Sequence, residues 1–77
     1  MDIVKVTWRD ARLYPGEHTD LEHLRAPVYE TVGFEHPPDK DGSIVLACER
    51  DDEGGWRQIT IIPAGMVLNR EVILADA

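Results

Sequence analysis

Short stretches that alternate between apolar and polar residues run along this chain and predict β-strands. Residues 3–9 (IVKVTWR) place Val4, Val6 and Trp8 on one face and polar side chains on the other. Residues 43–49 (SIVLACE) are apolar almost throughout, which is typical of a strand covered on both sides. We expect five strands, at residues 3–9, 27–35, 43–49, 56–62 and 67–74.

Turn-forming residues separate these stretches. Residues 36–42 (HPPDKDG) contain two prolines and a glycine, and residues 50–55 (RDDEGG) have the composition of an acidic hairpin loop. Pro63 lacks a backbone N–H and therefore ends the fourth strand. The stretch 64–66 that follows has room for one turn of 3₁₀ helix before the last strand begins.

The longest connection, residues 10–26, contains a helix-start signal. Thr19 and Glu22 have the spacing of a capping box, in which the two side chains bond each other's backbone N–H groups. Leu21 and Leu24 would then share one face of the helix. We expect one or two helical turns here, held by the packing of these leucines and ended by Pro27.

These elements indicate a small all-β domain that occupies the whole chain, residues 1–77. Closing five short antiparallel strands into a barrel removes the exposed edges that would otherwise pair with other chains. We therefore expect a five-stranded meander closed as an SH3-like barrel, with a short helical turn in the first connection. An Sm-like or OB-like barrel is the second choice.

The charge and the residue composition exclude some classes of binding partner and indicate a compartment. The net charge of −7 argues against a protein that binds nucleic-acid phosphates or an anionic membrane surface. No apolar run approaches the roughly 20 residues of a membrane span, and the N-terminal residues lack a signal-peptide pattern. Cys48 is the single cysteine, so an intrachain disulfide is impossible and a reducing compartment suits the chain. We expect a cytoplasmic protein.

The sequence contains no motif that is typical of catalysis or metal binding. Ser43 is the only serine and lacks a Gly-x-Ser-x-Gly frame, and Cys48 is expected to be a small core side chain. The three histidines lack the spacing of zinc ligands. Residues 39–44 resemble the middle of an EF-hand loop, but the flanking positions lack ligands and a β-turn explains the Asp-Gly pair. We therefore expect no enzymatic activity, metal or cofactor.

Aromatic side chains are the first candidates for a binding surface. Trp56 falls on the strand face opposite Ile59 and Ile61. If that face points outward, Trp56 joins Tyr29 and Tyr14 in an interaction patch, because exposed aromatic residues often anchor protein partners. The alternative is that Trp56 caps the open end of the barrel.

Acidic side chains are the second candidates. Asp51, Asp52 and Glu53 lie in the loop between the third and fourth strands. In a meander this loop lies at the same end as the acidic first connection, and an acidic pole would result. Such a pole would bind a basic partner or imitate the phosphates of nucleic acid, whereas the alternative is ordinary solvation of loop tips.

Two resemblances to known proteins bear on the fold and the origin of the chain. Residues 62–67 (IPAGMV) resemble the Ile-Pro-x-x-Tyr-Val segment at the end of SH3 domains, but Met66 replaces the tyrosine and the aromatic residues that bind proline-rich peptides have no counterpart. The segments VTWRDA (6–11), VGF (32–34) and IVLA (44–47), followed by 62–67, resemble small uncharacterised proteins of tailed bacteriophages and prophages. That resemblance implies a phage or mobile-element accessory protein and supplies no catalytic residues.

Three functions remain open. The first is a non-catalytic module that binds a host or phage protein. The alternative is a protein that sequesters a small ligand or nucleotide. Such a protein would have to be an oligomer, because one small barrel has no room for a pocket of about 300 Å³. A second alternative is an acidic mimic of nucleic acid, whereas direct nucleic-acid binding is disfavoured by the charge.

Overall fold

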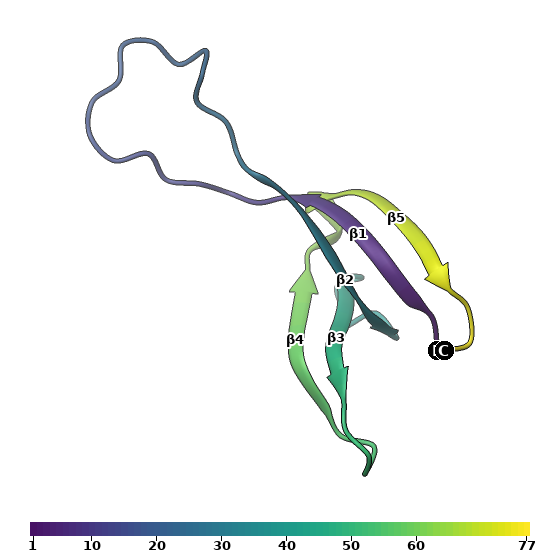
Figure 1. Cartoon of the computed structure of the whole chain (residues 1–77). Helices are drawn as coiled ribbons and strands as arrows, with labels where there is room; N and C mark the ends of the chain where they lie inside the picture. The colour runs from purple at the N-terminus through teal and green to yellow at the C-terminus, as the bar shows by residue number, and fades with distance from the viewer.

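The computed structural model describes residues 1–77 as an all-β protein. It contains five strands and one 3₁₀ turn: β1 (Ile3–Arg9), β2 (Val28–His36), β3 (Ile44–Arg50), β4 (Trp56–Ile62), η1 (Ala64–Met66) and β5 (Val67–Leu74) (Figure 1). The five predicted strands are confirmed, as is the 3₁₀ turn after Pro63. No helix is long and apolar enough to cross a membrane.

All five strands form one antiparallel sheet in the order β4-β3-β2-β1-β5. The sheet is not closed, so the expected barrel closure is wrong: β4 and β5 form its two free edges. The two edges meet at one corner through η1 and diverge from there (Figure 1). Only residues 34–36 of β2 pair with β3, whereas β1 and β2 share seven pairs. The short β2–β3 ladder lets the β3–β4 hairpin turn away from β5.

The hydrophobic core is thin. Only seven of 77 residues are buried, and four large apolar side chains form the core: Val4, Val6, Leu46 and Ile62. Trp8 and Ile44 are among the partly buried residues that pack against them. The predicted inner face of β1 is thereby confirmed. Each buried aliphatic side chain contributes about 1.5–3 kcal/mol to the free energy of unfolding. With only four such side chains, the stability of the fold depends strongly on each of them.

The connection between β1 and β2, residues 10–27, projects from the sheet as a long arm (Figure 1). The expected helix within it is absent. Asp20, rather than Thr19, accepts a hydrogen bond from a backbone N–H (that of Glu22, 3.1 Å), and the N–H of Leu24 donates to the carbonyl of Leu21 at 3.1 Å. This single turn does not continue, because short helices need a packing partner and Leu21 is exposed.

The arm makes the molecule elongated, with principal extents of 53 × 22 × 21 Å. Its radius of gyration is 15.5 Å, whereas a compact chain of this length would have about 11.5 Å. The N and C termini lie together at the far end of the sheet from the arm (Figure 1).

Candidate protein-binding surface

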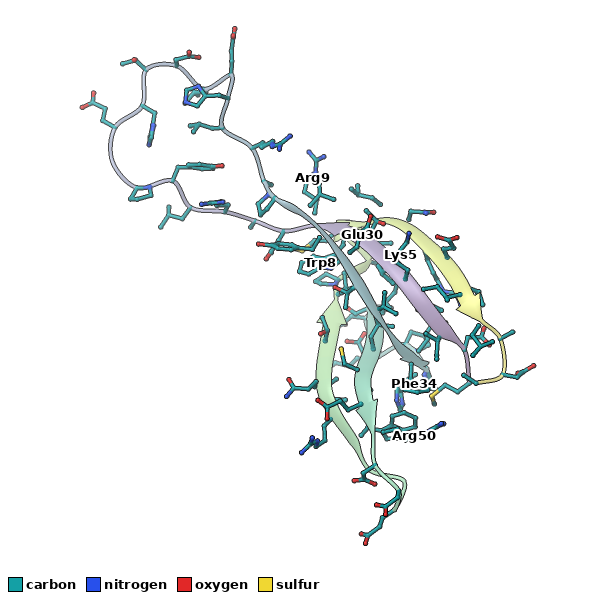
Figure 2. All side chains as sticks on the ribbon, viewed as in Figure 1. Lys5, Trp8, Arg9, Glu30, Phe34 and Arg50 are labelled. Atoms are coloured by element: carbon teal, nitrogen blue, oxygen red, sulfur yellow. The ribbon has the colours of Figure 1, made fainter.

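The aromatic residues predicted to form one patch lie in three separate places. Tyr29 contacts Trp8, Trp56 contacts Phe34, and Tyr14 lies in the arm. Trp8 and Phe34 are at opposite ends of the sheet in Figure 2. The structure therefore does not bring the three predicted aromatic residues together.

Tyr29 belongs to a pair at the base of the arm. The β1–β2 register places Trp8 opposite Tyr29, with ring centroids 5.2 Å apart. The indole N–H of Trp8 donates to Oγ1 of Thr31 at 2.9 Å, which satisfies the polar edge of the ring. Tyr29 remains exposed. It is available to a partner that approaches the junction of sheet and arm.

Trp56 lies in an aromatic cluster formed by residues from β2, β3 and β4. Its ring centroid is 4.4 Å from that of His36 and 5.3 Å from that of Phe34, both in edge-to-face geometry. The guanidinium carbon of Arg50 lies 4.7 Å from the Phe34 centroid and 5.8 Å from that of Trp56, within cation–π range. Trp56 is half-buried by these contacts, so it is not part of a freely exposed patch, and the open sheet has no barrel end for it to cap.

Tyr14 has a local structural role. Its hydroxyl donates to the carbonyl of Arg25 at 2.9 Å and so joins the two limbs of the arm. The N–H of Asp10 donates to the carbonyl of Pro27 at 2.9 Å and closes the base of the arm. Arg12 lies over the Tyr14 ring, with its guanidinium carbon 5.2 Å from the centroid. These contacts give the arm a defined shape without regular secondary structure.

The most exposed large apolar side chains belong to the arm. Leu13 is 86% exposed and Leu21 is 64% exposed. Sequence reasoning did not select Leu13 and assigned Leu21 to packing, because an apolar residue in a predicted loop carries no periodic signal. Only the position of the arm, away from the sheet, shows that neither leucine has a partner in its own chain.

The acidic loop between β3 and β4 does not join the acidic residues of the arm. The loop and the arm lie at opposite ends of the molecule (Figure 1). The expected acidic pole is therefore wrong. The direction of the β3–β4 hairpin, turned away from β1 and β2, separates the two acidic groups and removes the main geometric basis for a mimic of nucleic acid.

Asp51 shapes this loop, whereas Asp52 and Glu53 expose their side chains on it. Oδ1 of Asp51 accepts hydrogen bonds from the backbone N–H groups of Glu53 (2.9 Å) and Gly55 (2.7 Å). Gly54 has a φ of 86°, which favours glycine. Residues 39–43 form the same turn, with Oδ1 of Asp39 bonding two N–H groups at 2.9 Å. The segment that resembles an EF-hand is thus a second copy of a hairpin turn.

Asp51→Ala should lower the free energy of unfolding by about 1 kcal/mol, because it removes two hydrogen bonds that close the turn. Asp52→Ala, one residue away, should change the stability by less than about 0.5 kcal/mol, as surface substitutions usually do. Urea denaturation followed by circular dichroism checks both values. Equal losses for the two variants would contradict the structural role of Asp51.

A shallow, open cleft of about 640 Å³ lies where the N-terminal residues meet the end of β2. The cleft is open to solvent rather than enclosed. Eight residues line it: Met1, Asp2, Glu35, His36, Pro37, Pro38, Ile44 and Arg70. The only buried side-chain N or O atom without a hydrogen-bond partner, Nε2 of His36, belongs to this lining.

Glu35 and Arg70 form the main ionic contact of the cleft. Nε and Nη2 of Arg70 donate to the two carboxylate oxygens of Glu35 at 2.7 and 2.5 Å. The hydrogen bond with Glu35 raises the pKa of Arg70, so the guanidinium remains charged in this pair. Sequence reasoning did not select either residue. The available signal was Arg70 itself, which interrupts an otherwise apolar face of β5.

Several apolar residues of the sheet are also exposed. Ile59 and Ile61 of β4 turn away from the core, while Ile62 turns into it. Cys48, expected in the core, is exposed as well, with Sγ 3.7 Å from the carbonyl of Val32. The reason is that the sheet is a single layer, and nothing covers the second half of β3. The exposed large apolar residues of β5 are Leu68, Val72, Ile73 and Leu74.

No protein-family model, curated protein or solved structure matches this chain. The side chains also form no group of three or more His, Cys, Asp or Glu that could hold a metal ion. The arrangement of the described residues offers apolar contact surface, a polar cleft and an aromatic cluster.

Proposed function

We propose that this chain is a non-catalytic, cytoplasmic protein-binding module that presents the arm, residues 10–27, to a protein partner. The observation that carries the proposal is the exposure of Leu13 and Leu21 on a segment that projects beyond the sheet (Figure 1). Singly exposed leucines are common on protein surfaces, but here two of them lie on one protruding loop. Loops longer than about 12–15 residues in small domains are usually functional or disordered.

The contacts within the arm favour function over disorder. The Tyr14–Arg25 and Asp10–Pro27 hydrogen bonds hold the two limbs together. A loop held in one shape loses less conformational entropy when it binds than a free segment does. Burial of each leucine in a partner's pocket would contribute about 1.5–3 kcal/mol.

The charge of the arm indicates the chemistry of the partner. Glu17, Asp20 and Glu22 lie around Leu21, whereas the two arginines of the arm, Arg12 and Arg25, lie nearer its base, and the whole chain carries a net charge of −7. An apolar pocket with a basic rim would complement this surface and would accelerate association at low salt. The partner expected is therefore a protein with such a pocket.

The resemblance of residues 6–11, 32–34, 44–47 and 62–67 to small proteins of tailed phages supports an accessory role in a phage or prophage. In that setting the partner is a host or phage protein. The resemblance supports a phage origin for the chain, whereas the exposed arm supports the proposed mode of binding.

Paired capture experiments test the proposal. The tagged chain should retain a partner from cells of its natural host at physiological salt, and a double variant, Leu13→Ser with Leu21→Ser, should lose it. The matched control is Ile61→Ser, which removes an isoleucine of 56% exposure from the sheet. With the purified partner, the double variant should bind at least about tenfold more weakly. Equal binding by wild type, double variant and control would contradict the proposal.

The cleft supports a second candidate function, the binding of a small polar ligand. The cleft lining includes His36, whose buried Nε2 has no hydrogen-bond partner in the chain. Native mass spectrometry of protein purified from its natural source should then detect a bound mass that His36→Phe loses. A wild-type protein of apo mass would exclude this candidate.

A further inference from the structure

One side of β2 has no partner along the first part of the strand. β1 pairs with β2 at seven consecutive positions, from Val28 to Phe34, without a register shift. On the other side of β2, only residues 34–36 pair with β3. Residues 28–33 therefore have a free side between β2 and β3, where the β3–β4 hairpin turns away (Figure 1).

The backbone presents hydrogen-bonding groups to this free side at alternate residues. Successive residues of an antiparallel strand direct their N–H and C=O groups to opposite neighbours. The N–H of Glu35 donates to the carbonyl of Asp2 at 2.9 Å, so the odd-numbered residues of β2 face β1. The even-numbered residues Val28, Glu30 and Val32 therefore direct their N–H and C=O groups to the free side.

A contact at Val32 supports this direction. Sγ of Cys48, on β3, lies 3.7 Å from the carbonyl oxygen of Val32. A thiol is a weak donor, and here it lies where a paired strand would place a backbone N–H. The carbonyl of Val32 thus points to the free side, beyond the end of the ladder between β2 and β3.

The free side of β2 lacks the irregularities of the two outer edges of the sheet. The register of β5 against β1 shifts at Leu68 and at Ile73, and β4 contains Gln58 with a φ of 57°. Residues 28–33 have no register shift, no positive φ, no proline and no lysine. Bulges, prolines and lysines are the features that usually prevent a free strand from pairing with another one. This stretch of β2 is therefore suited to pairing with a further strand.

The side chains of the same three residues indicate which strand would fit. Val28 and Val32 are each 47% exposed, and Glu30 between them is exposed as well. Lys5 and Arg9 lie on the neighbouring strand, but neither forms an ion pair with Glu30. Side chains directly opposite on paired strands contact each other, and opposite charges are favourable there. The complementary strand therefore has an apolar, a basic and an apolar residue at alternate positions.

We propose that residues 28–32 bind an extended basic segment of a protein partner, which pairs with β2 as an additional antiparallel strand. In this mode of peptide recognition the backbone hydrogen bonds provide affinity, and side chains at alternate positions provide selectivity. The segment has the pattern apolar-x-basic-x-apolar, with its basic residue opposite Glu30. The net charge of −7 attracts such a segment. The site lies on the sheet and does not depend on the leucines of the arm.

Amide hydrogen exchange with a synthetic peptide tests the site. The probe is the acetylated and amidated peptide Thr-Val-Thr-Lys-Thr-Val-Thr at millimolar concentration. It should slow the exchange of the amides of Val28, Glu30 and Val32 by about twofold or more once half of the protein is bound. The amides of Tyr29 and Thr31 face β1 and should keep their rates. Unchanged rates at the three even-numbered residues would overturn the proposal.

Peptides with one backbone N-methyl group separate strand pairing from side-chain contact. In the paired strand the lysine of the peptide directs its N–H toward Glu30, whereas the threonine before it directs its N–H outward. N-methylation of the lysine should weaken binding by about tenfold or more, and N-methylation of that threonine should change it by less than about twofold. Replacing the lysine by glutamate should weaken binding by about threefold or more. Equal affinities of the two methylated peptides would contradict strand pairing.

Variants of the protein complete the test. Glu30→Pro removes the N–H on the free side and no hydrogen bond to β1, so it should abolish peptide binding while circular dichroism shows a folded sheet. The methylated peptides test the same hydrogen bond on the wild type if this variant does not fold. Slower exchange of residues 28–32 at rising protein concentration without peptide would assign this edge to a second copy and overturn the proposal. The double variant Leu13→Ser with Leu21→Ser should bind the peptide as the wild type does, which separates this result from the test of the arm.

Discussion

Leu46→Ala is expected to remove a large share of the free energy of unfolding of this protein. Leu46 is fully buried and belongs to a core of only four large side chains. Replacing a buried leucine by alanine costs about 2–5 kcal/mol, because transfer energy is lost and a cavity remains. A domain of 77 residues has a total stability of roughly 4–12 kcal/mol. The loss is therefore a large share of the total.

Urea denaturation followed by tryptophan fluorescence and circular dichroism measures this effect. The matched control is Leu21→Ala, which makes the same substitution on the exposed arm and should change the stability by less than about 0.5 kcal/mol. Similar losses for the two variants would mean that Leu46 is not the centre of the core. A normal stability for Leu46→Ala would lead to the same conclusion.

Gly33→Ala is expected to produce the second large effect. A Cβ atom at Gly33 would lie 2.8 Å from the carbonyl oxygen of Ala47 and 3.3 Å from Cβ of Leu46. The atom it meets first is backbone, which cannot move without disturbing β3. Overpacking of this kind costs about 1–3 kcal/mol. Here it falls beside the β2–β3 ladder, which has only three residue pairs to absorb the shift.

Gly65→Ala is the control for this prediction. Nothing lies within 4 Å of a Cβ atom at Gly65, so the added methyl group meets open space. Thermal unfolding should show a clear decrease in the midpoint for Gly33→Ala and little change for Gly65→Ala. Retention of the wild-type midpoint by Gly33→Ala would contradict the close approach of β2 and β3.

The positions of the strands were predictable because their signals are local. Alternation of apolar and polar residues is a property of the strand itself, and it located β1 and β5 to the residue. Pro63 ends β4 because proline has no backbone N–H and cannot donate a hydrogen bond to the neighbouring strand. The signals for β2 and β3 were equally local, with ends displaced by one residue.

The capping box in the arm is a local sequence signal that did not predict the structure correctly. Thr19 and Glu22 have the correct spacing, yet no helix forms between β1 and β2. A short helix is stable only when its apolar face packs against something. The sheet is too far from the arm to provide that contact, and the sequence contains no information on that distance.

Which residues meet at a surface depended on contacts between distant parts of the chain. Trp56 and Phe34 are 22 positions apart, and their packing follows from how the β3–β4 hairpin turns relative to β2. The same geometry exposed Cys48 and placed the acidic loop far from the arm (Figure 1). Glu35 and Arg70 likewise meet only because β5 pairs with β1 rather than with β4.

The amino-acid sequence by itself determined the all-β class, the five strands, their turns and the 3₁₀ corner, because side-chain period, proline and glycine act over a few residues. The tertiary structure alone decided that the sheet stays open, that the arm projects without a helix and that β5 keeps a free edge. These features depend on how far the sheet twists and on which strands meet. Such long-range geometry is set by the balance of many weak contacts across the whole chain.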